Sequence, residues 1–269
     1  QVGTQRSNIC RLESGAQNPG IDTLLKISAA LGKKINFELS DREEADMQTY
    51  ILKLYDRELM RFTLAESGLE GLRAELVSVQ EDKKNLFPYG LEPTGEGILS
   101  WLKSRVVPKN RRFVEEILAS FGLNANDTKG IIDICKGLSL NDSYWVVPEG
   151  FKGSFAEYNL YENRFSEILS LVAYTGTEQS DAHFTTSPEF TTGGALPKAW
   201  RYIEGDGIYL YKGGNTILTY GGNEPYSEYY ACQIARQMGL NAVEYDLEKW
   251  KGILASKCKL FCSIDVSYV

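Results

Sequence analysis

The chain has 269 residues, of which 24% are charged and 43% hydrophobic, and its net charge is −7. This length is enough for two domains, each with its own core. No hydrophobic run reaches the roughly 18–20 residues that cross a bilayer, and there is no signal-peptide pattern, so we expect a cytoplasmic protein with no membrane partner. The acidic balance argues against nonspecific nucleic-acid binding by the whole surface.

The cysteine and histidine content limits the chemistry. The sequence has five cysteines and one histidine, and Cys258 and Cys262 are the only close pair. No cluster of histidine or cysteine completes a zinc site around that pair. A single histidine also argues against a Ser-His-Asp triad. We therefore expect reduced cysteines and no metal site.

The charge is distributed unevenly along the chain. Residues 1–40 contain five basic and three acidic residues, whereas the remaining 229 contain 24 basic and 33 acidic ones, a balance of −9. A small basic module thus precedes a larger acidic body. In the basic module the apolar spacing predicts helices over 4–14 and 21–31, followed by a strand over 34–39.

The acidic body has a mixed pattern of strands and helices. Strands are expected over 50–54, 59–64 and 73–79, and helices over 97–104, 110–121 and 127–136. The intervening residues 82–97 have the composition of a loop, and residues 146–153 that of a turn-rich connector. The pattern then predicts a helix over 163–174, a polar segment over 175–186, and a strand-rich unit from 199 that a helix over 225–238 interrupts.

The basic module resembles the lambda-repressor/Cro-type (XRE) family of helix-turn-helix proteins. The resemblance rests on residues 2–32, through the spacing of Glu-x-Gly, Asn-Pro and Leu-Gly. It implies that residues 4–13 form a recognition helix for operator DNA, bound as a homodimer. By side-chain chemistry, Gln5, Arg6 and Asn8 suit base edges, and Thr4 and Arg11 suit phosphates. The family's first helix is missing, so we expect DNA binding by a longer parent protein; composition alone favours a solvated polar helix.

A second group of residues has the order found around nucleotide phosphates. A small-residue loop containing Gly193 and Gly194 leads to Lys198, a strand then ends at Lys212, and a helix with an early Glu228 follows. Such a loop leaves backbone amides free for phosphates, the lysine supplies a point charge, and the glutamate holds the lysine. Taken singly, each feature has an ordinary alternative: a glycine turn, a solvated hairpin lysine, or a glutamate favoured by the helix dipole.

Residues 192–198, the strand to Lys212 and residues 227–240 resemble the N-lobe of the HipA-like serine/threonine kinases. Residues 101–142 are similar to the small N-terminal subdomain of those proteins. The resemblance implies that Lys212 is the nucleotide lysine, Glu228 its partner and 193–198 a flexible phosphate loop. It also implies a hinge strand, for which residues 260–265 are apolar enough. Because family members often autophosphorylate near the loop, Ser187, Thr191 and Thr192 are candidate acceptors.

The sequence departs from this family in one respect. The catalytic loop with its Asp base, and the Asp that binds the metal, should follow the hinge, and the sequence contains neither Asp-Arg-His nor Asp-Phe-Gly. We therefore assign no catalytic base and no magnesium ligand. The sequence is interpreted as a fragment that lacks both ends of its parent.

Together these features predict an α+β protein in three parts. We expect a partial, all-α helix-turn-helix over 1–40, a mixed α+β subdomain over 48–150, and a kinase-like N-lobe, an antiparallel sheet plus helix, over 151–269. The full-length parent would use ATP and magnesium to phosphorylate a protein substrate, as a toxin-type kinase with an antitoxin-like DNA-binding domain. Two alternatives remain: a transcriptional regulator with a noncatalytic, kinase-like sensor or interaction domain, and a regulatory subunit of a separate kinase.

Overall fold

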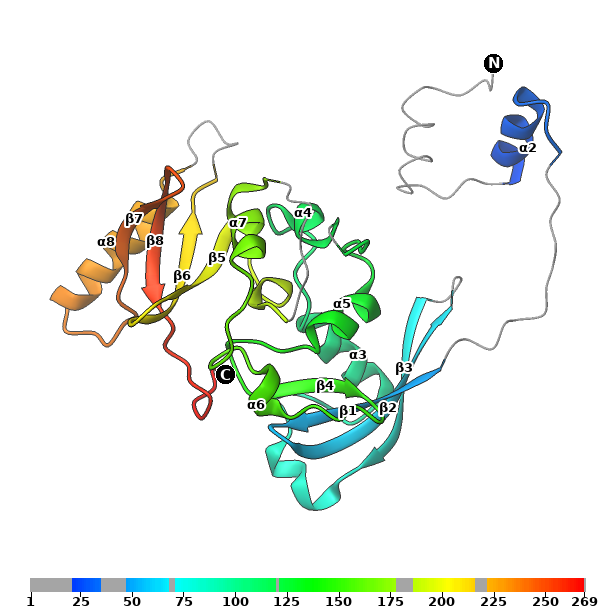
Figure 1. Ribbon diagram of the computed structural model, residues 1–269, viewed down its shortest axis with the longest axis horizontal. Helices are drawn as coiled ribbons and strands as arrows, with labels where there is room; N and C mark the ends of the chain where they lie inside the picture. The colour runs from blue at the N-terminus through cyan, green and yellow to red at the C-terminus, as the bar shows by residue number, and fades with distance from the viewer. Residues whose placement is uncertain are drawn as a thin grey trace. The chain divides into compact units, whose positions relative to one another are not determined.

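The computed structural model describes residues 21–34, 47–67, 71–119, 121–177, 186–215 and 222–268. The chain divides into two compact units, residues 1–44 and residues 45–269. The described part of the first unit holds one helix, α2 (Ile21–Ala30), as the sequence predicted (Figure 1). The helix predicted over 4–14, and the strand predicted over 34–39 apart from its first residue, lie outside the described residues.

The second unit begins with an antiparallel sheet in which the strand order is β3-β2-β1-β4. Its first three strands follow one another along the chain: β1 (Gln48–Leu54), β2 (Arg57–Ser67) and β3 (Gly71–Val79). All three predicted strands are confirmed, and β2 is longer than predicted. A turn at Tyr55 and Asp56 joins β1 to β2, and Tyr55 adopts a left-handed conformation there with φ 52°.

The fourth strand corrects the sequence prediction. Residues 146–153 were expected to form a turn-rich connector, but β4 (Tyr144–Pro148) pairs with β1 along its whole length. The proline and glycines that predicted a turn lie at and beyond the end of this strand. Pro148 is tolerated there because β4 is an edge strand, on which the missing N–H breaks no ladder hydrogen bond toward a further strand.

Helices α3 (Gly95–Ser104) and α5 (Thr128–Cys135) pack on the first sheet, and α4 (Val114–Ala119) lies between them in sequence and packs on a later helix, α7 (Glu167–Thr175). The Thr94 side chain caps α3 by accepting from the amide of Gly97 at 3.1 Å, and Asp127 caps α5 by accepting from Gly130 at 2.7 Å. The predicted loop over 82–97 is therefore wrong at both ends, because it contains a 3₁₀ helix (Glu81–Leu86) and the start of α3. The middle helix α4 is shorter than predicted.

The rest of the unit is a second antiparallel sheet with its own helices. After α6 (Phe155–Tyr158), α7 (Glu167–Thr175) and a 3₁₀ turn (Pro188–Phe190) come β5 (Lys198–Ile203), β6 (Gly207–Gly213), α8 (Glu224–Gln237), β7 (Asp246–Trp250) and β8 (Ile253–Lys259). The strand order is β5-β6-β8-β7. Helix α7 packs on β5, and α8 packs on β8, β7 and β6. The predicted α+β class is confirmed.

A shared hydrophobic core joins the two sheets. Alternate residues of β1 and β4 point to opposite faces, and both faces are buried. Tyr50, Leu52 and Val146 pack on the helix side. Ile51, Trp145 and Val147 instead belong to a second cluster that includes Trp200 of β5 and Ile208 of β6. This two-sided burial explains why the centres of β1 (Tyr50–Leu52) and β4 (Trp145–Val147) are continuous apolar runs rather than alternating ones.

The segment after β8 differs from the predicted hinge strand. Residues 260–265 form no regular strand, and only an isolated bridge joins Ser263 to Val266. The segment is fastened to the first sheet instead, because Tyr55 and Ser143 both donate side-chain hydrogen bonds to the carbonyl of Ile264, at 2.9 and 2.7 Å.

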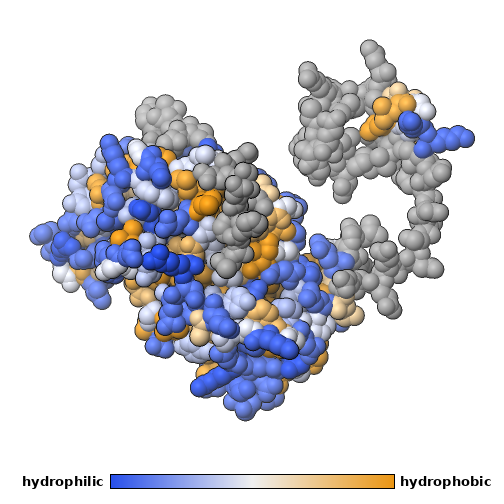
Figure 2. Space-filling view, viewed as in Figure 1, coloured by the Kyte–Doolittle hydropathy of each residue, from blue (hydrophilic) through white to orange (hydrophobic). Residues whose placement is uncertain are grey.

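The outer surface of this unit is mixed in character. On the face that Figure 2 shows, hydrophilic side chains predominate and hydrophobic ones lie in small groups between them. Within the described ranges, no helix has both the length and the apolar character needed to cross a membrane.

Candidate functional site

The structure brings Lys212 and Glu228 together as an ion pair. Lys212 lies on β6, and its Nζ is 2.9 Å from Glu228 Oε1 on α8. Lys212 also donates to the Tyr245 hydroxyl at 2.8 Å. The other oxygen of Glu228 accepts a short hydrogen bond from the hydroxyl of Ser256, which faces Lys212 across the β6–β8 ladder. Both groups of the pair are thus fixed from two sides.

These contacts decide the charge of Lys212. Burial disfavours the ammonium form, but the hydrogen bonds to Glu228 and Tyr245 outweigh it, so the pKa of Lys212 lies above its ordinary value. The lysine is therefore a permanent positive charge at neutral pH. A solvated hairpin lysine, the ordinary alternative for this residue, does not describe it, because only 21% of its side chain is exposed.

The loop before β5 has a clear polarity. Four of its carbonyl oxygens accept hydrogen bonds. Side chains donate to two of them, Arg111 to Thr192 and Lys198 to Gly193. Backbone amides donate to the other two, Arg112 to Ala195 and Gly213 to Pro197. The amides of residues 193–196 donate to no other residue that the structure describes. These amides are therefore available to an anion, and successive free amides are the groups from which anion-binding nests are built.

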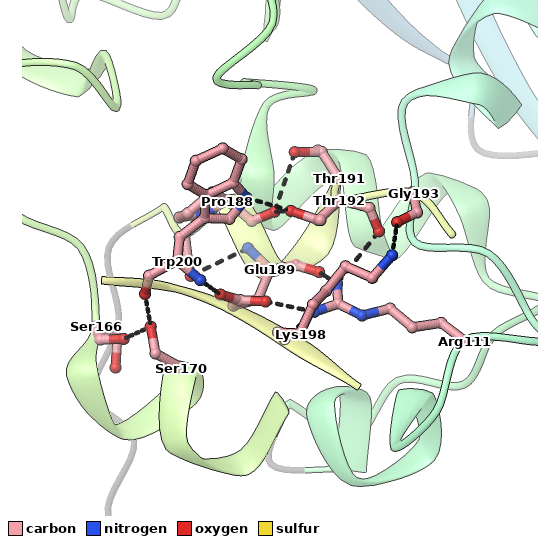
Figure 3. Close-up of polar contacts among 11 residues, drawn as sticks. Arg111, Ser166, Ser170, Pro188, Glu189, Thr191, Thr192, Gly193, Lys198 and Trp200 are labelled. Carbon is pink, nitrogen blue, oxygen red and sulfur yellow. Dashed lines mark hydrogen bonds and ion pairs between the residues drawn. The ribbon is translucent and has the colours of Figure 1, made fainter. Parts of the chain in front are cut away.

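Lys198 lies at the end of this loop, as the first residue of β5, and it is buried. Its Nζ donates to the carbonyl of Gly193 at 2.7 Å (Figure 3). Burial, with the charges of Arg111 and Lys212, lowers the pKa of Lys198 to about 8. Glycine is favoured at position 194 because its φ is +86°, a conformation that other residues rarely adopt, and a Cβ there would displace the Lys198 ammonium.

Lys198, Lys212 and Ser256 occupy matching positions on three adjacent strands, so their side chains share one face of the sheet. A pocket of about 230 Å³ opens on this face. It is lined by both lysines, by the loop from Thr191 to Gly193, by Trp200 and Leu210, and by Ser139, Leu140 and Asn141 of the preceding subdomain. The sequence-predicted residues Gly193, Lys198 and Lys212 thus meet at one pocket.

A buried ion pair behind the loop was not predicted from the sequence. Arg111 Nη2 lies 2.5 Å from Glu189 Oε2, and both side chains are fully buried. Burial raises the pKa of Glu189 despite the nearby Arg111. Nothing in the sequence marks these residues, because Arg111-Arg112 looks like a solvated pair and Glu189 like a loop residue. Around the pocket, the buried or half-buried cations Arg111, Lys198 and Lys212 outnumber the carboxylates Glu189 and Glu228 by one.

The three candidate acceptor hydroxyls differ in exposure. Ser187 and Thr191 are buried, and Thr191 donates to the carbonyl of Leu138 at 2.8 Å. Thr192 is only partly buried; it donates to the carbonyl of Pro188 at 2.6 Å and accepts from the Trp200 indole at 2.9 Å. All three hydroxyls belong to the segment that carries the loop.

The predicted DNA-contacting residues Thr4, Gln5, Arg6, Asn8 and Arg11 lie outside the described residues. Among the residues that are described, no group of three or more His, Cys, Asp or Glu side chains is placed to hold a metal ion.

Comparison with solved structures finds similar chains. No protein-family model matches the sequence, and no curated protein matches it. A chain in the solved complex of the Shewanella oneidensis MR-1 toxin–antitoxin system, HipA, HipB and its operator DNA, is similar with 15% identity and a TM-score of 0.47. The similarity covers 79% of this chain and 50% of that one, so this chain spans about half the length of its structural neighbour.

Proposed function

We propose that residues 45–269 hold the phosphates of ATP, as the nucleotide-binding part of a HipA-like serine/threonine protein kinase. The observation that carries this proposal is the loop whose amides are unpaired among the described residues, facing a lysine that Glu228 holds in place. Phosphoryl transfer depends on positioning and charge neutralisation, and these groups supply both. Lys212 would contact the α- and β-phosphates, and the amides of Gly193 and Gly194 would cradle them.

The chemistry of the pocket fits a polyphosphate. The charged residues among the described ones that line it are Lys198 and Lys212, and excess positive charge in a cleft attracts anions. Its volume of about 230 Å³ is below the roughly 300–1,000 Å³ of pockets that enclose a whole ligand, so we assign it to the phosphates alone. We assign no metal ligand and no catalytic base to the described residues.

For the complete protein we propose a DNA-binding function as well. Residues 1–40 would read operator DNA through Gln5, Arg6 and Asn8, with Thr4 and Arg11 on phosphates, in a homodimer. The body would phosphorylate a protein substrate with ATP and magnesium. This proposal is supported by the helix-turn-helix spacing and by the positive balance of residues 1–40 in an otherwise acidic chain.

The test compares two lysines of the same sheet. Lys212→Met removes the proposed phosphate contact, whereas Lys257→Met removes an ion pair of similar exposure: Lys257 Nζ lies 2.6 Å from Glu248 Oε2, on the opposite face. We expect Lys212→Met to weaken ATP binding at least about tenfold in calorimetric titrations, and Lys257→Met to leave it unchanged. Equal affinity of Lys212→Met and the unmodified chain would refute the site. ATP binding by a complete protein that transfers no phosphate would favour the noncatalytic sensor.

A further inference from the structure

The phosphate loop is held in place by a single side chain from the preceding subdomain. Arg111 lies between α3 and α4, and its guanidinium reaches the segment on either side of the loop (Figure 3). Nη1 donates to the carbonyls of Glu189 and Thr192, at 2.7 and 3.2 Å. Nη2 donates to the Glu189 carboxylate and to the carbonyl of Lys198, at 2.5 and 2.9 Å.

The chemistry of these contacts requires arginine. The planar guanidinium carries five donors in a fixed fork, whereas a lysine offers one point of attachment. The two terminal nitrogens of Arg111 donate to four acceptors. Its Nε has no hydrogen-bond partner in the described part of the chain. The buried charge is compensated by Glu189, whose second oxygen accepts from the amide of Trp200 at 2.8 Å. Breaking such a pair leaves an uncompensated charge in the interior.

The position of the contacts matters more than their number. The accepting carbonyls belong to Glu189 before the loop, Thr192 where it begins and Lys198 where it ends. The neighbouring backbone adds two bonds, from the amide of Val107 to the Phe190 carbonyl at 2.6 Å and from the amide of Arg112 to the Ala195 carbonyl at 2.8 Å. The N–H and C=O of one peptide unit point in opposite directions, so drawing the carbonyls of Thr192 and Ala195 toward the subdomain turns the amides of Gly193 and Leu196 away from it. The amide of Gly194 is oriented instead by the Gly193 carbonyl, which accepts from Lys198.

We propose that Arg111 is a positioning residue for phosphate binding, which fixes the loop with its amides directed at the ligand and makes the preceding subdomain part of the nucleotide site. This inference rests on the proposed function. Arg111 itself does not line the pocket. Its effect on phosphate affinity is therefore exerted through the loop.

The variant that tests this is Arg111→Lys, which keeps the charge and loses the fork. Its matched control is Arg105→Lys, because Arg105 is also a buried arginine paired with a carboxylate, Asp142, at 2.5 Å, and donates to the carbonyls of Gly137 and Tyr144. None of these acceptors lines the pocket. The probes are ATP and inorganic tripolyphosphate. We expect Arg111→Lys to lower the affinity for both about fivefold or more, and Arg105→Lys to leave both affinities unchanged.

The outcomes separate the two claims. If the unmodified chain binds neither probe, or binds both independently of Lys212, the proposed function fails. If it binds both and Arg111→Lys binds equally well, or if Arg105→Lys loses as much affinity, only the positioning role is overturned. A second measurement needs no variant. Hydrogen exchange should show the amides of Val107 and Arg112 protected without ligand, and those of Gly193 and Gly194 protected only when ATP is bound. Unprotected amides at Val107 and Arg112 would refute the positioning role, even if Arg111→Lys does not fold.

Discussion

At the scale of single residues, Lys198 gives the site a dependence on pH. Burial, together with Arg111 and Lys212, lowers the pKa of Lys198 to about 8 in the folded protein. The ammonium form is the one that attracts phosphate. We therefore expect the affinity for ATP to fall as the pH rises through about 8, in titrations between pH 7 and 9.5. A Lys198→Met variant should bind ATP more weakly and show little change over the same range.

The same lowered pKa predicts the opposite trend for stability. An unfolded chain keeps Lys198 protonated up to its ordinary pKa of 10.5, so between about 8 and 10.5 the unfolded state binds more protons than the folded one. The free energy of unfolding contributed by this residue therefore rises with pH in that window. Denaturant unfolding at pH 7 and 9.5 should show the unmodified chain gaining stability relative to Lys198→Met, and a relative loss would contradict the lowered pKa.

The residues around the pocket also show what a sequence can and cannot predict. The order of loop, lysine and glutamate can be read from the sequence, and the structure brings Lys212 and Glu228 together. Their role in binding ATP remains a prediction. Tyr245, Ser256, Arg111 and Glu189 were not foreseen. They come from four other places in the chain, and their side chains become neighbours only when sheet, loop and subdomain pack, so local spacing carries no trace of them.

At the scale of elements, the predictions succeeded where apolar spacing marks the element and failed where turn-forming residues lie at its end. Strand β4 was interpreted as part of a turn-rich connector because Pro148, Gly150 and Gly153 lie at and beyond its end, and no alternation marks it as a strand because both of its faces are covered. Helix α3 was predicted to begin two residues late. Its first residue is Gly95, a poor helix former, and the cap on Thr94 that starts it is a side-chain contact.

Helix α5 offers a direct test of capping in this fold. Asp127 accepts from the amide of Gly130 at 2.7 Å and so satisfies one of the donors that the first turn leaves free. We expect Asp127→Ala to lower the free energy of unfolding by about 1 kcal/mol, and the midpoint of thermal unfolding by roughly 2–4 °C. Asp127→Asn should keep most of the stability because its amide oxygen can accept the same bond. Equal losses in both variants would point to the charge of Asp127 rather than the cap.

At the scale of the whole molecule, the core of residues 45–269 is complete without residues 1–44. Its three hydrophobic clusters extend from Tyr50 to Ile264 and include no described residue of the first unit. The first cluster packs the first sheet with α3, α4, α5 and α7, the second joins β1 and β4 to α6 and to β5 and β6, and the third joins α7 to the second sheet. A unit with its own hydrophobic core can fold independently.

We therefore expect a chain of residues 45–269 to unfold in one cooperative transition, with a free energy of unfolding within roughly 0.5 kcal/mol of that of the same unit in the full chain. Its affinity for ATP should be unchanged, because every residue of the pocket lies between Ser139 and Lys212. Urea titration followed by circular dichroism measures the free energy of unfolding, and a binding titration measures the affinity for ATP.

A matched chain that also lacks β1, residues 55–269, is the control. It should not fold, because Tyr50 and Leu52 belong to the first hydrophobic cluster and Ile51 to the second. If residues 45–269 were as unstable as this control, the division of the chain at residue 44 would be wrong.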